Sequence, residues 1–426
     1  MDADELKNPV ALYIHVPFCR ARCAYCDFNT YAGLEPLIPA YVAAVCREIK
    51  AAGERWGHLI VPTVYFGGGT PSLLPLDLLE KLFRALRLTF HVSDDAEITL
   101  EANPGTVTPA YLRGLRRLGV YRLSLGVQSA HEDELRLLGR IHTWAQAVEA
   151  VEWAREAGFV NLNLDLIFGL PAQTLACWRE TLRAALALSP EHLSLYCLSV
   201  EEGTPLENRI AGGELPAPDE DLAAEMYELA EEVLAEAGFF HYEISNWARA
   251  KLKAQSPKPK PRRWWPEPKT WNLKPGMASE QLSPYVCRHN LIYWRNEPWL
   301  GVGAGAHSWL SGGILSLSKG HRWANVRHPR AYIAACGTGC QPVLRQEVEV
   351  IDRHLEMEET MMLGLRLAEG VSDARFQARF SRGLEEVFGA ELAELQEWGL
   401  LEWDGRVARL TARGRLLGNQ VFVRFV

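Results

Sequence analysis

Residues 13–31 read YIHVPFCRARCAYCDFNTY, and the rest of the chain is arranged around this stretch. Its three cysteines, Cys19, Cys23 and Cys26, form a C-x3-C-x2-C array directly after the apolar run 11–16. This pattern predicts a strand that ends in a loop with three thiolates. Thiolates are the preferred ligands of iron–sulfur clusters. Three of them leave one iron of a 4Fe–4S cluster without a protein ligand, so that iron can bind another molecule.

Two other interpretations of the cysteines stay open, a zinc site and a disulfide. A structural zinc ion normally has four ligands, and no fourth Cys or His lies at zinc-finger spacing in this stretch. No basic segment followed by an apolar one marks a signal peptide. Nine cysteines, an odd number, therefore predict a reducing cytoplasm rather than a disulfide framework.

The composition is that of a soluble globular protein. The 426 residues allow two or three domains, and 48% are hydrophobic and 23% charged. No apolar run approaches the roughly 20 residues that cross a membrane. The net charge of −8 argues against general nucleic-acid binding.

Short apolar runs alternate with amphipathic helical patterns from residue 11 to about residue 200. The predicted strands are 11–16, 63–66, 97–101, 122–127, 161–168 and 192–199. The predicted helices are 40–52, 76–88, 109–118, 143–157 and 175–188. Six strand–helix repeats predict a parallel sheet of the α/β class. Because a full barrel needs eight, we expect a partial (β/α)6 barrel with its ligand site at the carboxyl ends of the strands.

The remaining chain divides into two further parts. We expect a barrel core at 1–200, an extension at 201–340 and a third domain at 341–426. The extension includes residues 249–286, which carry seven prolines and nine Lys or Arg. This composition predicts a flexible insertion. Its tryptophans leave contact with a membrane surface or an acidic ligand as an alternative to a solvated loop.

The third domain is predicted to contain two helices, a hairpin and a final helix. The helical patterns are 352–367 and 384–398, and an Asp-Gly turn at 404–405 predicts the hairpin. This order is typical of a winged-helix-like α+β domain. Such domains often bind DNA, but the acidic chain has no obvious basic recognition helix, so we favour a structural role.

A glycine run follows the second predicted strand, where Gly67-Gly68-Gly69-Thr70-Pro71 allows the backbone to approach a ligand closely. One strand after the cysteine array, this GGGTP string resembles the radical S-adenosylmethionine (SAM) superfamily. The resemblance implies that three cysteines bind a 4Fe–4S cluster. It also implies that the free iron chelates the methionine amine and carboxylate of SAM.

Polar residues close the next predicted strands. Glu101, Gln128 and Asp165 end the third, fourth and fifth strands, and Arg140 follows the fourth. Such groups on one rim predict recognition of ribose and carboxylate groups. The guanidinium fork of Arg140 suits the SAM carboxylate.

These strings together resemble the oxygen-independent coproporphyrinogen-III oxidase-like proteins over most of the chain outside its insertions. The resemblance implies a radical SAM partial barrel. It also implies these SAM contacts: Tyr13, Tyr25, Gly68, Gly69, Thr70, Glu101, Gln128, Arg140 and Asp165.

This subfamily comprises oxidases of porphyrin biosynthesis and HemW-type heme chaperones. The oxidases carry a further cysteine two positions after the last cluster ligand, where this chain has Phe28. They also carry a long extension before the first strand, where this chain has residues 1–10. Both differences favour the chaperone branch.

Residues 289–294 read HNLIYW and match the HNxxYW motif of the heme chaperones. Imidazole is a common axial ligand of heme iron, and aromatic rings offer flat faces to a porphyrin. We therefore expect His289 to ligate heme and Tyr293 and Trp294 to contact it. A buried histidine in an aromatic core is the alternative. His307 is expected to face the SAM or tetrapyrrole pocket.

The resemblance thus predicts a cytoplasmic heme chaperone with a 4Fe–4S cluster, SAM and heme. Its expected partners are apo-hemoproteins that accept heme, an electron donor for the cluster and a second copy of the chain. The alternative is a coproporphyrinogen-III oxidase, which would cleave SAM to a 5′-deoxyadenosyl radical and decarboxylate propionate side chains. A winged-helix regulator is a third alternative, which predicts salt-sensitive DNA binding.

Overall fold

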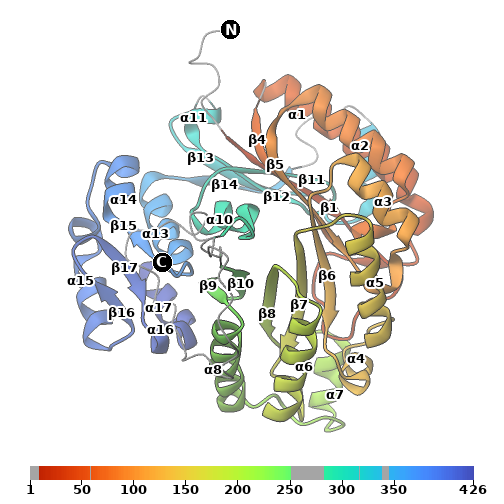
Figure 1. Ribbon diagram of the computed structural model, residues 1–426. Coiled ribbons are helices and arrows are strands. Elements are labelled where there is room, and N and C mark those ends of the chain that lie inside the picture. The colour runs from red at the N-terminus through yellow and green to blue at the C-terminus, as the bar shows by residue number, and fades with distance from the viewer. Residues whose placement is uncertain (1–8, 58, 251–282, 316, 338–344) are drawn as a thin grey trace, which may run out of the picture. The chain divides into compact units, whose positions relative to one another are not determined.

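A computed structural model describes residues 9–57, 59–250, 283–315, 317–337 and 345–426 (Figure 1). The chain forms two compact units, and each is described by itself. The first unit comprises Met1–Asp165, Ser199–Pro216 and Arg288–Met357. The second comprises Leu166–Leu198, Ala217–Cys287 and Glu358–Val426.

The first unit is built on a mixed sheet. Its strands follow the order β14-β13-β12-β11-β1-β4-β5-β6, and the first residues of β7 come next. Strand β1 pairs in parallel with β4 and β11, and the pairs β4–β5 and β5–β6 are also parallel. The bounds are β1 Ala11–Val16, β4 Ile60–Gly68, β5 His91–Ala102, β6 Arg122–Gln128, β7 Leu162–Phe168, β11 Trp299–Val302, β12 His307–Leu310, β13 Gly320–Asn325 and β14 Arg345–Ile351. A separate parallel pair consists of β2 Phe18–Cys19 and β3 Tyr31–Ala32.

Helices connect the parallel strands of this sheet, and α1, α2, α3 and α5 follow one another along it (Figure 1). Their apolar sides pack inward, as expected for crossover helices. The bounds are η1 Glu35–Leu37, α1 Ile38–Trp56, η2 Pro71–Leu73, α2 Leu76–Thr89, η3 Pro104–Thr106, α3 Pro109–Leu118, α4 Glu132–Leu137, α5 Trp144–Glu156, α7 Pro205–Ala211, α10 Arg288–Trp294, α11 Gly312–Leu315 and α12 Pro329–Gly337.

A buried glutamate attaches the HNxxYW helix to the sheet. Helix α10 begins at Arg288, and the first backbone N–H groups of the helix have no partners within it. The carboxylate of Glu97 in β5 accepts hydrogen bonds from the N–H groups of Arg288 and His289, at 3.1 and 3.2 Å. A negative charge at a helix N-terminus also complements the helix dipole. The motif is therefore held against β5.

The second unit combines the end of the repeat region with the C-terminal part of the chain. Its strands follow the order β7-β8-β10-β9 from the second half of β7, and β15-β17-β16 form a small antiparallel sheet. The strand bounds are β8 His192–Cys197, β9 Phe239–Glu243, β10 Asn246–Arg249, β15 Val371–Ser372, β16 Leu401–Trp403 and β17 Val407–Leu410. The helix bounds are α6 Leu175–Ala187, α8 Glu220–Glu236, α13 Arg353–Gly364 (which begins in the first unit), α14 Asp373–Phe380, α15 Leu384–Glu397, α16 Ala412–Leu416, α17 Gly418–Phe422 and η5 Val423–Phe425.

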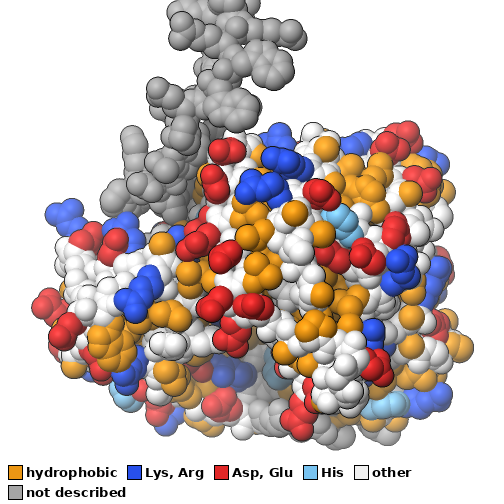
Figure 2. All heavy atoms as spheres, turned by 90° about the horizontal axis from the view of Figure 1, so that it is seen from below, with side chains coloured by type: hydrophobic (Ala, Val, Ile, Leu, Met, Phe, Trp, Pro, Cys, Tyr) orange, Lys and Arg blue, Asp and Glu red, His pale blue; other side chains and the backbone are white. Residues whose placement is uncertain are grey.

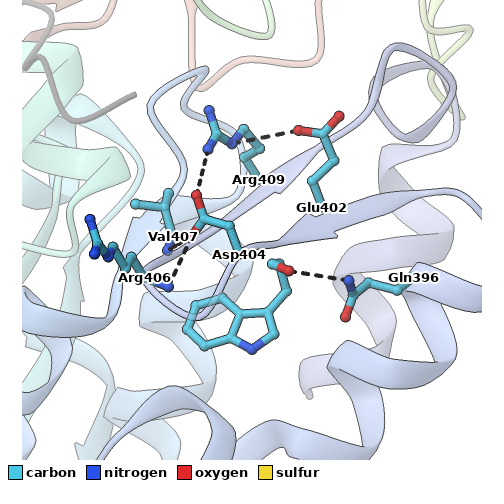
Figure 3. Close-up of polar contacts among 7 residues, drawn as sticks. Gln396, Glu402, Asp404, Arg406, Val407 and Arg409 are labelled. Carbon is cyan, nitrogen blue, oxygen red and sulfur yellow. Dashed lines mark hydrogen bonds and ion pairs between the residues drawn. The ribbon is translucent and has the colours of Figure 1, made fainter. Parts of the chain in front are cut away.

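The predicted Asp-Gly hairpin joins β16 and β17 (Figure 3). The Asp404 carboxylate accepts hydrogen bonds from the N–H groups of Arg406 and Val407 at 2.9 and 2.8 Å. Gly405 has a φ of +78°, which favours glycine. Arg409 in β17 forms an ion pair with Asp404 at 3.2 Å. This local chemistry explains why the hairpin could be predicted from the sequence.

The six predicted strand–helix repeats are present as β1-α1, β4-α2, β5-α3, β6-α5, β7-α6 and β8-α8. Most of the predicted insertion, residues 251–282, lies outside the described residues. In the described part of the chain, each helix is too short or too polar to cross a lipid bilayer. The face drawn in Figure 2 mixes acidic and basic side chains instead of presenting one basic stripe.

Leu100 provides a test of the core of the first unit. Its side chain is fully buried in β5, between its register partners Phe66 in β4 and Leu123 in β6. We expect Leu100→Ala to lower the free energy of unfolding by about 2–5 kcal/mol, because it removes buried contacts and leaves a cavity. The control Leu88→Ala, 75% exposed in α2, is expected to change it by less than about 0.5 kcal/mol. Urea denaturation measures both, and equal effects would contradict this packing.

Candidate functional site

The three cysteines lie in the loop that follows β1. Cys19 is in β2, whose pairing with β3 closes the loop between residues 20 and 30. Cys23 and Cys26 lie within the loop, and all three side chains are partly exposed. The N–H of Ala24 donates to the carbonyl of Leu138 at 3.0 Å, which attaches the loop to the segment after β6.

The surroundings of the thiols suit an iron–sulfur cluster. Burial raises the pKa of the Cys19 thiol, and the neighbouring Cys26 and Cys23 raise it further. A hydrogen bond from Thr70 has the opposite effect, which is smaller than that of burial. Arg140 Nη1 donates to Cys23 Sγ at 3.2 Å, and Thr70 Oγ1 donates to Cys19 Sγ at 3.6 Å. Within the described residues no three Cys, His, Asp or Glu side chains are grouped to hold one metal ion. A 4Fe–4S cluster binds each thiolate to a different iron.

The glycine run passes directly beside this loop. A Cβ at Gly69 would lie 3.0 Å from Cys19 Sγ and 2.7 Å from the carbonyl oxygen of Phe18. Gly68 has a φ of +114°, and a Cβ there would lie 2.4 Å from the His15 ring. Only glycine fits at these positions, because any side chain would collide with the cysteine loop or the His15 ring.

His15 was not among the predicted site residues, yet it connects the loop to β1. Its Nε2–H donates to the carbonyl of Asn29 at 3.0 Å, and its Nδ1 then accepts from the Tyr13 hydroxyl at 3.0 Å. Burial lowers the pKa of His15 to about 4, against the opposing effect of the Asn29 carbonyl. The imidazole is therefore neutral at pH 7 and acts as a fixed support.

Glu101 lies at the end of β5 beside the glycine run. Its carboxylate accepts hydrogen bonds from the Tyr65 hydroxyl at 2.8 Å and from the Gly68 N–H at 3.1 Å. Burial is the main cause that raises the pKa of Glu101 from 4.5 to about 7, and the Asp165 carboxylate adds to it. Glu101 is thus poised to hold or release a proton near neutral pH.

Arg140 and Gln128 converge on the next strand end. Arg140 Nη2 donates to the Gly126 carbonyl at 2.8 Å, while its Nε–H is buried without a partner among the described residues. Gln128 is a non-glycine residue with a φ of +71°, a strained conformation that is typical of functional sites. The buried N–H provides a hydrogen-bond donor for a ligand.

Asp165 belongs to a polar group on β6 and β7. Its carboxylate accepts hydrogen bonds from Ser124 at 3.0 Å and Asn163 at 2.8 Å. Tyr25 lies near both Asp165 and Arg140, and burial raises its pKa well above the ordinary value. The structure thus brings the predicted SAM contacts of β4, β5, β6 and β7 to one end of the sheet. Their role as SAM contacts stays a prediction.

A cavity of about 510 Å³ opens beside these residues, within the usual range for small-molecule sites. It is lined by Tyr13, His15, Asp27, Phe28, Asn29, Gly68, Glu101, Tyr293, Trp299, Gly305, His307 and Arg327. Predicted SAM contacts and residues of the predicted tetrapyrrole site therefore share one cavity in the first unit.

The three residues of the HNxxYW motif have different surroundings. His289 is buried, and its ring contacts the Thr63 hydroxyl through Nδ1 at 2.8 Å and the Tyr293 hydroxyl through Nε2 at 3.1 Å. Burial lowers the pKa of His289 to about 3, so it is neutral. Tyr293 lines the cavity; Trp294 is half-buried and outside the lining that the described residues form. Ligation of iron by His289 stays a prediction, and the geometry matches the alternative of a buried aromatic core.

Comparison with known proteins places these features in a family. A family model of the radical SAM superfamily matches residues 13–185, and one of the HemN C-terminal domain matches residues 351–417. The heme chaperone HemW of Bacillus subtilis is 35% identical over 415 residues, which are 97% of this chain and 98% of that protein. The chain belongs to the heme chaperone HemW family. The HemW of Mycobacterium tuberculosis strain H37Rv is 36% identical over 419 residues, 97% of this chain and 94% of that protein.

The fold is also found in a solved structure of the wider HemW and HemN group. The structure of HemN, a radical SAM coproporphyrinogen III oxidase from Escherichia coli, has a TM-score of 0.77 with 23% identity. It covers 98% of this chain and 90% of that one. This likeness confirms the predicted fold class. Membership of the radical SAM superfamily implies a 4Fe–4S cluster and SAM, and the GGGTP and cysteine motifs of this chain fit both.

Several lining residues of this HemW-family chain were not predicted from the sequence. Trp299 and Arg327 follow no motif that the sequence analysis used, and they reach the cavity from β11 and from the segment after β13. Asn29 was quoted only as part of the cysteine stretch. The YIHVPFC string contained a signal for His15, because His15 is two positions from Tyr13 and so lies on the same face of β1.

Glu101 leads to a pH-dependent prediction. Its folded pKa of about 7 lies above its ordinary value of 4.5, so the folded state binds the proton more tightly. The free energy of unfolding of wild type therefore falls as pH rises from 4.5 to about 7. Glu101→Gln has no carboxyl group to titrate, so it does not show this fall. We expect the variant to gain about 1–2 kcal/mol relative to wild type between pH 4.5 and pH 7, less than the full shift in pKa implies, because Glu101 is only partly buried. Urea unfolding at a series of pH values tests this prediction, with Glu80→Gln, an exposed glutamate, as the control. If the free energies of unfolding of wild type and Glu101→Gln follow parallel curves against pH, the prediction is refuted.

Proposed function

We propose that this chain is a heme chaperone that binds heme, carries a 4Fe–4S cluster with exchangeable SAM, and transfers heme to acceptor hemoproteins. The observation that carries the proposal is the shared cavity, in which Tyr293 of the HNxxYW motif lines the same space as Tyr13, Gly68 and Glu101. Family membership over nearly the whole chain supports it.

Cys19, Cys23 and Cys26 are the residues proposed to hold the cluster. When bound, the cluster supplies an iron that can chelate the amine and carboxylate of SAM. Arg140 has its unpaired Nε–H for a ligand carboxylate and donates an N–H···S hydrogen bond to Cys23. The glycine cradle at Gly69 keeps the backbone close to Cys19.

The other side of the cavity suits a tetrapyrrole. Tyr293 and Trp299 lie edge to face with ring centroids 4.9 Å apart and present aromatic surface. Phe28 is 64% exposed at the cavity, and an exposed large apolar side chain there favours contact with an apolar ligand. Such an open, aromatic site fits a cargo that enters and leaves, with an apo-hemoprotein as acceptor.

The coproporphyrinogen oxidase alternative has less support. The likeness to the E. coli HemN structure, at 23% identity, concerns the fold. Phe28 occupies the position at which the resembled oxidases carry a further cysteine, and it lines the cavity. Anaerobic conversion of coproporphyrinogen by the purified chain would revive that alternative.

The cluster assignment predicts a selective effect of cysteine substitution. We expect Cys19→Ala to lose the iron and acid-labile sulfide of one 4Fe–4S cluster after anaerobic reconstitution. The control Cys46→Ala, a half-buried thiol of α1 that contacts the Lys81 carbonyl, is expected to keep them. Iron and sulfide analysis with electron paramagnetic resonance measures both. Full cluster content in Cys19→Ala would remove this residue from the ligand set.

The chaperone proposal predicts saturable heme binding and release. Wild type is expected to bind about one heme per chain, seen as a saturating Soret shift, because one cavity holds the predicted contacts. Added apomyoglobin should then convert the spectrum to that of holomyoglobin, with a rate that rises with apomyoglobin concentration. A titration without saturation would contradict the proposal. Heme that stays on the chain after apomyoglobin is added would also contradict the proposal.

A further inference from the structure

The cavity has an outer wall whose side chains match the three chemical parts of a heme. His307 offers an imidazole, Arg327 a guanidinium, and Phe28, Tyr293 and Trp299 offer aromatic surface. Heme iron takes an imidazole, its propionates take a guanidinium fork, and its macrocycle takes aromatic faces. These side chains belong to five segments of the first unit and line one space.

We infer that His307 is the axial ligand of heme iron in this cavity and that Arg327 binds a heme propionate. The inference rests on the proposed function, because it names the residues by which the chaperone would hold its cargo. His289 then acts as a positioning residue behind the site.

Exposure separates His307 from the other candidate imidazoles. Within the described residues the imidazoles that line the cavity are those of His15 and His307. His15 is buried with both ring nitrogens bonded to Tyr13 and Asn29, so neither nitrogen faces a ligand. His289 is also buried and bonded through both nitrogens. His307 is exposed at the start of β12.

The loop that presents His307 is held rigidly from α1. The Tyr41 hydroxyl accepts a hydrogen bond from the Ala304 N–H at 2.9 Å. The Glu48 carboxylate accepts from the Gly303 N–H at 2.8 Å and from Asn325 at 2.7 Å. A ligand placed on a fixed backbone loses little conformational entropy when it binds. The sequence GVGAGAH thus places an imidazole on a pre-organised support.

Aromatic contacts connect His289 to this wall. The His289 ring lies 5.0 Å from that of Tyr293, which lies 4.9 Å from Trp299. Trp299 Nε1 in turn donates to the His307 carbonyl at 3.2 Å. Replacing His289 would therefore loosen Tyr293 and weaken heme binding without removing the iron ligand. This explains how the HNxxYW motif can matter for heme while its histidine is buried.

Arg327 lies close to the same loop through backbone contacts. The carbonyl of Val326 accepts from the Gly305 N–H at 3.0 Å, and the side chain of Asn29 donates to the carbonyl of Arg327 at 3.0 Å. The Arg327 side chain is exposed at the cavity. Asp27 lines the cavity too, so propionates would be oriented away from its carboxylate and toward Arg327.

The test is a ferric heme titration of the full chain, read by absorbance and electron paramagnetic resonance. We expect His307→Ala to weaken binding at least about tenfold and to lose the imidazole-ligated spectrum. Added imidazole should restore that spectrum, because it fills the space that the side chain left. His289→Ala should keep the imidazole-ligated spectrum even where affinity falls. The control is His354→Ala, an exposed histidine of α13, which should match wild type.

The outcomes separate the inference from the proposed function. If wild type binds heme and His307→Ala keeps the wild-type spectrum, His307 is not the ligand and the chaperone proposal stands. If His289→Ala instead loses the imidazole-ligated spectrum and added imidazole restores it, His289 is the ligand. In that case too the inference on His307 fails and the chaperone proposal stands. If wild type binds no heme, the inference on His307 and the proposed function are both contradicted.

Arg327 is tested with an esterified ligand. Arg327→Gln is expected to weaken binding of heme by about tenfold but to leave binding of heme dimethyl ester unchanged, because the ester has no carboxylate to pair. Arg330→Gln, an exposed arginine of α12, is the matched control. Equal losses for heme and its ester in Arg327→Gln would overturn the propionate contact.

Discussion

The site depends on the hydrogen bonds of Asn29, which lies three residues after the last cluster cysteine. Its carbonyl accepts from His15, and its side-chain amide donates to the carbonyls of Ala304 and Arg327, each at 3.0 Å. Gly305 leaves the space that the amide occupies, since a Cβ there would lie 2.3 Å from Asn29 Nδ2. One residue therefore connects the cysteine loop, the first strand and the outer wall of the cavity.

This connection gives the cavity two chemically different sides. On the sheet side, glycines and polar groups at the strand ends surround the cysteine loop, and Glu101 titrates near neutral pH. On the outer side, aromatic rings, an exposed imidazole and a guanidinium face the same space. A cluster with SAM and a heme would then be neighbours.

Local signals allowed much of the fold and of the sheet side to be predicted. The six repeats followed from periodicity, and the cysteine spacing and GGGTP string identified the family. Trp299 and Arg327 of the outer wall could not be predicted, because their place depends on contacts such as Asn29 to Ala304, 275 residues apart in sequence. His289 shows the same limit: its motif pointed to a ligand, but tertiary packing buries the ring and engages both nitrogens.

The central claim is that the tetrapyrrole binds in the cavity that predicted SAM contacts line, beside the loop of the cluster cysteines. Zinc protoporphyrin, a fluorescent heme analogue that takes one axial imidazole, tests this most directly. Its emission lifetime would be measured on the reconstituted chain and on cluster-free Cys19→Ala. The account predicts a clearly shorter lifetime on the cluster-loaded chain, because a neighbouring cluster quenches emission. Equal lifetimes, with the analogue bound to both proteins, would contradict it.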